Sequence, residues 1–178
     1  SQNDEMSIKN GIQNPGVFYP GSHKLSTGST NSYSYYNLWS MDNIATGFND
    51  NVVVKTVYDP CPAGFKMPAS NAFTGFTENG KNGGNMNDDR TDDGEPFLNN
   101  YGHNFWTNNQ KNATIYFPVT GLREKFSAFL TIMDIGCYWL AIPFDAKNGC
   151  FMEFSGSEIK PLHGLDRHYG HSVRPVAE

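Results

Sequence analysis

The hydrophobic residues of this chain fall in short runs rich in β-branched and aromatic side chains, each bounded by Gly, Pro, Asn or Asp. Runs of this kind predict strands. They lie at 51–59, 113–121, 136–144 and 149–157, and a further edge strand is expected at 157–162. The sequence DAKNG between 144 and 150 predicts a hairpin. Since no segment carries a helical stripe beyond two turns, the chain is predicted to be mostly β with little helix.

Two further segments complete the predicted organisation. Residues 68–76 are compatible with one or two helical turns in which Ser70 is the N-cap. Residues 77–104 show no periodicity and are rich in Gly, Asn and Asp. A structureless loop of this length inside a domain is usually functional or disordered.

Composition narrows the classes of protein. A length of 178 residues suits one domain, 1–178, which we expect to be a mature fragment or a piece of a longer protein. The net charge is −5 and no basic stripe is present, which argues against nucleic acid as a partner. No apolar run approaches the roughly 18 residues of a transmembrane segment. Charged residues make up only 17%, and the many Asn, Ser, Thr and Gly residues are typical of secreted, β-rich proteins.

The cysteines raise a question of chemistry. Cys61 lies in YDPCPAGFKMP, where prolines interrupt regular structure, and it could be a nucleophile, half of a disulfide or a packed residue. A packed and chemically quiet thiol at a fixed corner is the favoured interpretation. Cys137 and Cys150 should not be bonded to each other, because the predicted hairpin separates them by about 20 Å.

The acidic part of the long loop is a candidate cation site. The sequence DRTDDG resembles the start of an EF-hand loop, but Thr91 and Asn100 stand where ligands are required, so that match fails. A looser, oxygen-lined calcium site and a solvated loop remain as alternatives. The candidate ligands are Asp88, Asp89, Asp92 and Asp93.

The sequence YGHNFWT follows this loop and is a candidate ligand-binding site. Tyr101, His103 and Trp106 could stack on a sugar while neighbouring polar groups reach its hydroxyls. Trp106 serves equally well as a core residue.

Several motifs occur together in an order that resembles a known family. VYDPCPAGFKMP, IYFPVTG, GCYWLA and HSVRPVAE are similar to the C-terminal domain of Bacteroidetes fimbrillin-like surface proteins, itself similar to the Fibrobacter succinogenes major paralogous domain. The matching residues are Asp59, Pro60, Cys61, Pro62, Gly64, Phe65, Pro68, Gly136, Tyr138, Trp139 and 172–176.

The resemblance implies an α+β, mostly β, C-type-lectin-like fold with long loops and adjacent terminal strands, so that 12–19 would lie beside 172–176. It implies export to the cell surface or outer membrane, often through a lipoprotein precursor, and a role in cell adhesion. The expected function is non-enzymatic binding of a glycan or surface protein, with other fimbrial subunits as further partners. No cofactor is expected apart from the calcium considered above. A structural pilin-type subunit is the alternative, and an enzyme is less favoured. Any ligand is expected to contact 77–112 rather than the hairpin at 136–157.

Overall fold

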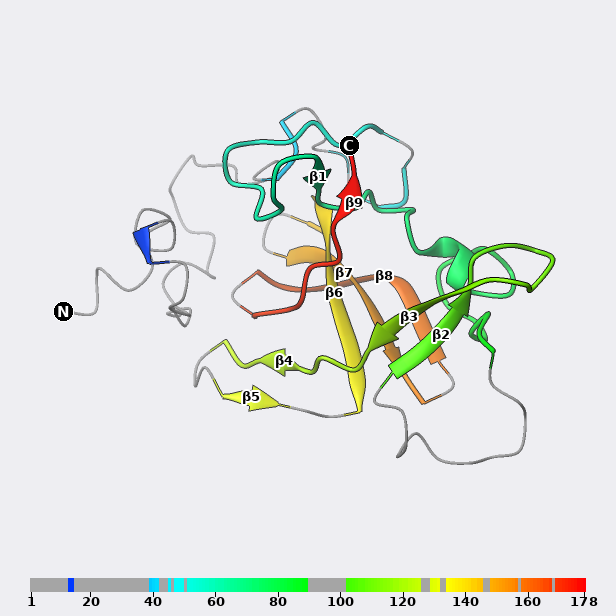
Figure 1. Ribbon diagram of the computed structural model, residues 1–178. Coiled ribbons are helices and arrows are strands. Elements are labelled where there is room, and N and C mark those ends of the chain that lie inside the picture. The colour runs from blue at the N-terminus through cyan, green and yellow to red at the C-terminus, as the bar shows by residue number, and fades with distance from the viewer. Residues whose placement is uncertain are drawn as a thin grey trace.

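The computed structural model describes residues 13–14, 39–41, 45, 47–49, 51–89, 102–125, 129–131, 134–145, 148–156, 158–167 and 169–178. Its centre is a three-stranded antiparallel sheet in the order β6–β7–β8, and Figure 1 shows β6 running through the middle of the molecule. The strands are β6 Ile135–Pro143, β7 Asn148–Ser155 and β8 Glu158–Asp166. The predicted hairpin and the strand after it are confirmed, and that last strand continues to Asp166.

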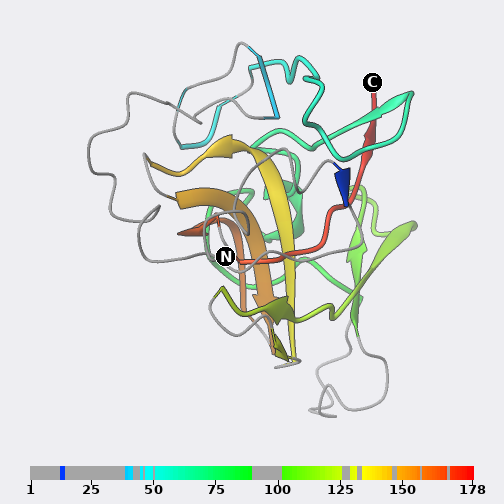
Figure 2. The same ribbon diagram turned by 90° about the vertical axis from the view of Figure 1, so that its left-hand side faces the viewer.

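Both faces of this sheet are buried, which explains the unbroken apolar run in β6. Tyr138, Leu140 and Ile142 belong to one hydrophobic core, whereas Trp139 and Ala141 between them belong to the other. Alternate side chains of a strand point to opposite faces. The sheet therefore separates two cores, and Figure 2 shows its strands side by side.

Smaller strand pairs surround the central sheet. β2 Gly102–Trp106 pairs with β3 Thr114–Pro118, which confirms the strand predicted at 113–121. β4 Leu122–Arg123 pairs with β5 Leu130–Thr131, and β1 Phe65–Lys66 pairs with β9 Val176–Ala177. The described part of the chain is mostly β, and its helical content includes the 3₁₀ turn η1, Thr74–Phe76.

Two local predictions are wrong. Residues 51–59 do not form a regular strand: one isolated bridge joins Lys55 to Ser40, and the amide of Val54 donates to the Ser40 hydroxyl at 3.2 Å instead of continuing a ladder. Ser70 is not an N-cap. Its hydroxyl is buried, accepts from the amide of Asn49 at 2.9 Å and donates to the carbonyl of the same residue at 3.1 Å.

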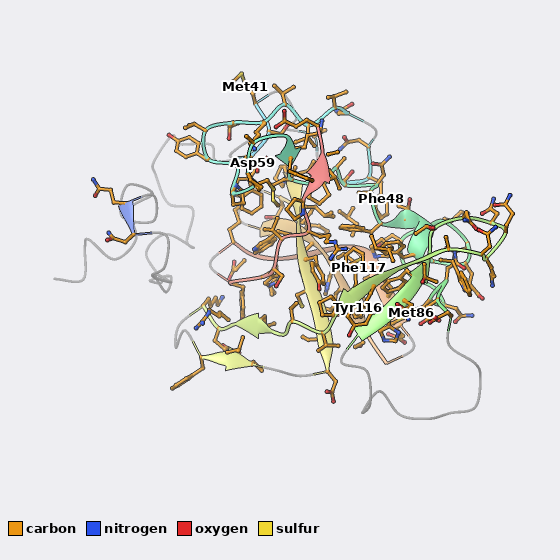
Figure 3. All side chains as sticks on the ribbon, viewed as in Figure 1. Met41, Phe48, Asp59, Met86, Tyr116 and Phe117 are labelled. Atoms are coloured by element: carbon orange, nitrogen blue, oxygen red, sulfur yellow. The ribbon has the colours of Figure 1, made fainter. Side chains whose placement is uncertain are left out.

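The proline-rich corner after 51–59 is held by one carboxylate. The two oxygens of Asp59 accept the amide of Cys61 at 2.8 Å and the amide of Met67 at 3.0 Å. The Lys55 ammonium donates to the carbonyls of Cys61, Pro62 and Phe65 at 2.6–2.8 Å. Figure 3 shows Asp59 close to β1. The corner is built on these two side chains, and Cys61 is a buried free thiol within it.

Two predictions concern segments that the structure describes only in part. Of the expected pairing of 12–19 with 172–176, the first segment lies outside the described residues apart from 13–14, so the pairing stays a prediction. Residues 172–176 are described, and within that part of the chain Ser172 bridges to Tyr138 and Val176 pairs with Lys66. Within the long predicted loop, 77–89 is described and is more ordered than expected, with bridges from Thr77 to Met86 and from Asp88 to Phe105. None of the helices in the described residues is long and apolar enough to cross a membrane.

Candidate functional site

Strand β2 carries the predicted ligand residues, and its alternation sorts them onto two sides. His103 and Phe105 are buried, whereas Gly102, Asn104 and Trp106 are partly exposed. The partner strand β3 repeats the pattern, with Phe117 buried and its neighbour Tyr116 exposed. The hairpin thus has an inner face on the core and an outer face toward solvent.

His103 lies beneath the hairpin rather than at the rim where the sequence placed it. Its side chain is 2% exposed, and its Nδ1 lies 2.9 Å from a carboxylate oxygen of Asp88. Its ring meets the ring of Phe154 edge to face at 5.4 Å. His103 therefore supports the hairpin from the core side instead of lining a surface.

The described acidic residues of the loop lie on different sides. Asp88 points inward to His103, whereas Asp89 is exposed and its amide donates to the carbonyl of Asn104 at 3.0 Å. Asp92, Asp93 and Tyr101 lie outside the described residues. Within 77–89 and the rest of the described chain, no three His, Cys, Asp or Glu side chains are placed to hold a metal ion together.

The outer side of the hairpin forms a mixed aromatic and polar surface. Across the two strands Asn104 lies opposite Tyr116, and Trp106 lies opposite Thr114. Asp89 extends this row, because the segment around Asp88 pairs with β2 on its other edge. We call this surface the outer hairpin face and define it by Asp89, Asn104, Trp106, Thr114 and Tyr116.

A glycine gives the outer hairpin face its shape. Tyr116 is 42% exposed, and its ring lies over Gly102, where an added Cβ would come within 2.7 Å of the ring carbon Cζ. Trp106 stands at the opposite end of β2, with Asn104 between them. Two aromatic rings separated by an amide side chain offer stacking surfaces and a hydrogen-bonding group to one ligand. Figure 3 shows Tyr116 next to the inward-facing Phe117.

The described ionisable groups with shifted pKa values are poorly suited to acid–base or nucleophilic chemistry at neutral pH. Burial raises the pKa of all three thiols to about 12, and hydrogen bonding to Asp59 adds to the effect at Cys61. Burial likewise raises the pKa of Tyr138 to about 12, and its hydroxyl donates to the carbonyl of Pro118 at 2.7 Å. Catalytic groups are usually tuned toward the working pH, and these are moved away from it.

Sequence reasoning missed Asn104 and Tyr116 as members of the site. Both could have been found by applying the two-residue period to 102–106 and 114–118 and asking which positions share the face of Trp106. In that pattern His103 falls on the face opposite to Trp106.

Comparison of the chain with protein-family models, with curated proteins and with solved structures finds no match. The resemblance to fimbrillin-like surface proteins therefore stays a prediction.

Proposed function

We propose that this protein is a non-enzymatic binding module of the adhesion type that recognises a glycan through the outer hairpin face. The observation that carries the proposal is that the partly exposed Trp106 and the exposed Tyr116 lie on one side of a paired hairpin, together with Asn104 and Asp89. Aromatic rings pack on the apolar faces of sugars, and amide and carboxylate oxygens accept from sugar hydroxyls.

The support beneath this surface favours a pre-formed site. The ring of Phe105 stacks on Phe76 at 4.4 Å and meets Phe154 at 5.5 Å, so the inner side of β2 is anchored in the core. The partner residue Phe117 is buried and meets Phe76 edge to face at 5.2 Å. Binding residues carried by rigid strands lose less conformational entropy when a ligand binds.

The wider biological setting of the proposal rests on the sequence resemblance. It comprises a C-type-lectin-like fold, export to the cell surface as a lipoprotein-derived adhesin, and association with fimbrial subunits. The mostly β architecture with long, side-chain-tethered loops is compatible with that setting. A calcium requirement would involve the acidic stretch after Asp89, and the binding experiment below includes it.

The test is a glycan array probed with the whole chain, with and without calcium, followed by titration of the best ligand against three variants. Trp106→Ala and Tyr116→Ala should each weaken binding about tenfold or more, because truncating an aromatic anchor commonly costs over about 1.4 kcal/mol. Tyr58→Ala is the matched control, since Tyr58 is 44% exposed but belongs to the proline-rich corner. Equal affinity for all three variants and the wild type would refute the proposed surface.

A structural pilin-type subunit is the second candidate, and one observation favours it. Many of the exposed large hydrophobic residues fall between 41 and 65, among them Val57, which is 88% exposed. They are Met41, Phe48, Val52, Val54, Val57, Tyr58 and Phe65. Exposed apolar side chains are typical of protein contacts where they form a contiguous patch. Concentration-dependent self-association that is abolished by Val57→Asp, with no ligand on the array, would favour this second function.

A further inference from the structure

His171 occupies an unusual position in the second core, on the side of the central sheet that carries Trp139. Its ring stacks on the Trp139 ring at 4.2 Å with an interplanar angle of 14°, and it meets the edge of Phe151 at 4.4 Å. Both ring nitrogens are buried, and neither has a hydrogen-bond partner in the described residues. The imidazole is therefore packed as an aromatic ring and receives no compensation for a charge.

The surroundings make a charge at this position unfavourable. Burial, followed by the nearby His163, lowers the pKa of His171 to about 3. On β7 the carboxylate of Glu153 faces His163 at 3.2 Å and Lys160 at 3.7 Å, so it is already engaged.

The other described neighbours contribute no free negative charge. The ring centres of Tyr169 and His171 lie 6.2 Å apart, and the Lys125 ammonium lies over the Tyr169 ring, 5.6 Å from its centre. That ammonium is paired with Asp166. The remaining members of this core are uncharged: Val53, Cys61, Met67, Cys137, Ala141, Trp39, Ala69, Leu122, Ile135, Leu165 and Val173.

Within the described residues, backbone hydrogen bonds attach the chain on both sides of His171 to β4 and β6. Gly170 exchanges two backbone hydrogen bonds with Arg123 of β4, at 2.8 and 3.1 Å. Ser172 accepts from the amide of Trp139 at 2.9 Å and donates to the carbonyl of Cys137 at 3.1 Å. His171 lies between these two attachments, so its packing against Trp139 joins them into one unit.

We propose that His171 is a proton-sensitive latch that holds the segment 169–173 against β4 and β6 while its ring is neutral and releases that segment when the ring takes up a proton. The proton comes from solvent and binds a ring nitrogen once the segment has opened. Release would leave the β1–β9 pair as the next attachment of the C-terminal segment along the chain.

The direction of the effect follows from proton linkage. The attached state binds a proton more weakly than the released state, so attachment is favoured above pH 6.5 and weakens progressively as the pH falls toward 3. With an ordinary histidine pKa of about 6.5 in the released state, lowering the pH from 7 to 5 should raise the equilibrium constant for release about 25-fold.

Hydrogen exchange measured by NMR on the whole chain tests the latch. Protection factors of the amides of Ser172, Gly170 and Trp139 should fall about 25-fold between pH 7 and pH 5, whereas those of the amides within β7 should change much less. An equal loss of protection in β7 would mean ordinary acid unfolding and would overturn the proposal.

Two variants assign the effect to one ring. His171→Phe keeps an aromatic ring against Trp139 and should abolish the pH dependence, whereas His163→Gln should retain most of it. Persistence of the dependence in His171→Phe, or its loss in His163→Gln alone, contradicts the latch. If His171→Phe does not fold, nitrogen-detected titration of the wild-type imidazoles decides: a His171 ring that becomes charged near pH 6.5 while the segment stays protected overturns the proposal.

Discussion

Removing the carboxylate of Asp59 should be among the most damaging single changes at the proline-rich corner. Asp59→Ala deletes the acceptor of two backbone amides, those of Cys61 and Met67, in a region where all three residues are buried. An unsatisfied buried donor costs about 1–3 kcal/mol, so two of them should lower the free energy of unfolding by about 2–6 kcal/mol. Asp59→Asn keeps one acceptor oxygen and should cost roughly half as much.

Urea denaturation followed by tryptophan fluorescence provides the measurement. The midpoint should shift while the slope stays constant, since the same surface is exposed on unfolding. Asp89→Ala is the control: this aspartate is exposed, and its change should remain within about 0.5 kcal/mol of the wild type. A loss of less than about 1 kcal/mol for Asp59→Ala would show that the prolines and Lys55 fix the corner without this carboxylate, and it would refute the reasoning.

Three further predictions concern the cores. With a pKa of about 12, only about one thiol in ten thousand is ionised at pH 8. An aromatic disulfide reagent should therefore react slowly with the native chain and rapidly after unfolding. Prompt reaction of a native thiol would contradict the burial of all three cysteines. Asp88→Ala removes the carboxylate beside the buried His103 and should cost about 1–3 kcal/mol in thermal unfolding, and an unchanged melting temperature would exclude a supporting role for this pair. Gly136→Ala places a Cβ against the buried ring of Phe154 and should lower the free energy of unfolding by about 1–3 kcal/mol. Gly164→Ala should cost less, because its Cβ meets the 41% exposed ring of Phe144, which can turn away. Equal costs of the two variants in urea denaturation would contradict this distinction.

The central hairpin was predictable because its signals are local. The apolar run of β6 is bounded by turn residues, and it is long enough for a strand but too short for most helices. The turn between Phe144 and Asn148 is closed by Asp145, whose carboxylate accepts from the amide and side chain of Asn148 at 2.8 Å. An apolar run and a turn-forming aspartate act over a few neighbouring positions, so both strands of the hairpin can be predicted from the local sequence.

The wrong predictions concern segments whose partners are distant in sequence. Ser70 has the residue type of an N-cap, but its hydroxyl binds the backbone of Asn49, 21 residues earlier. The side chain of Asn82 similarly accepts from the amide of Leu162, 80 residues later. Local sequence propensity does not predict such contacts, because the same side chain could hydrogen-bond either to the backbone at a helix end or to a backbone group far away in the sequence.

The position of His103 in the candidate site was mispredicted for a different reason: the sequence motif does not show which face of the strand each side chain occupies. His103, Asn104, Phe105 and Trp106 are consecutive, and residue type alone makes the histidine the most attractive ligand group. In a strand, however, neighbours face opposite ways, so His103 and Asn104 cannot both line one surface. Tyr116 lies on the same face as Asn104 and Trp106, and the register of β3 brings it there.

The two sides of β2 have different roles in the proposed function. The inner residues set how firmly the strand is held, since His103 bonds the Asp88 segment and Phe105 stacks in the core. In the proposed function, the outer residues would determine which ligand can bind. A substitution on the inner side should therefore lower stability and ligand affinity together, whereas Trp106→Ala should lower affinity with little change in stability. Measuring the free energy of unfolding and the ligand affinity of each variant separates a residue that supports the surface from one that contacts the ligand. Residue type alone does not make that distinction.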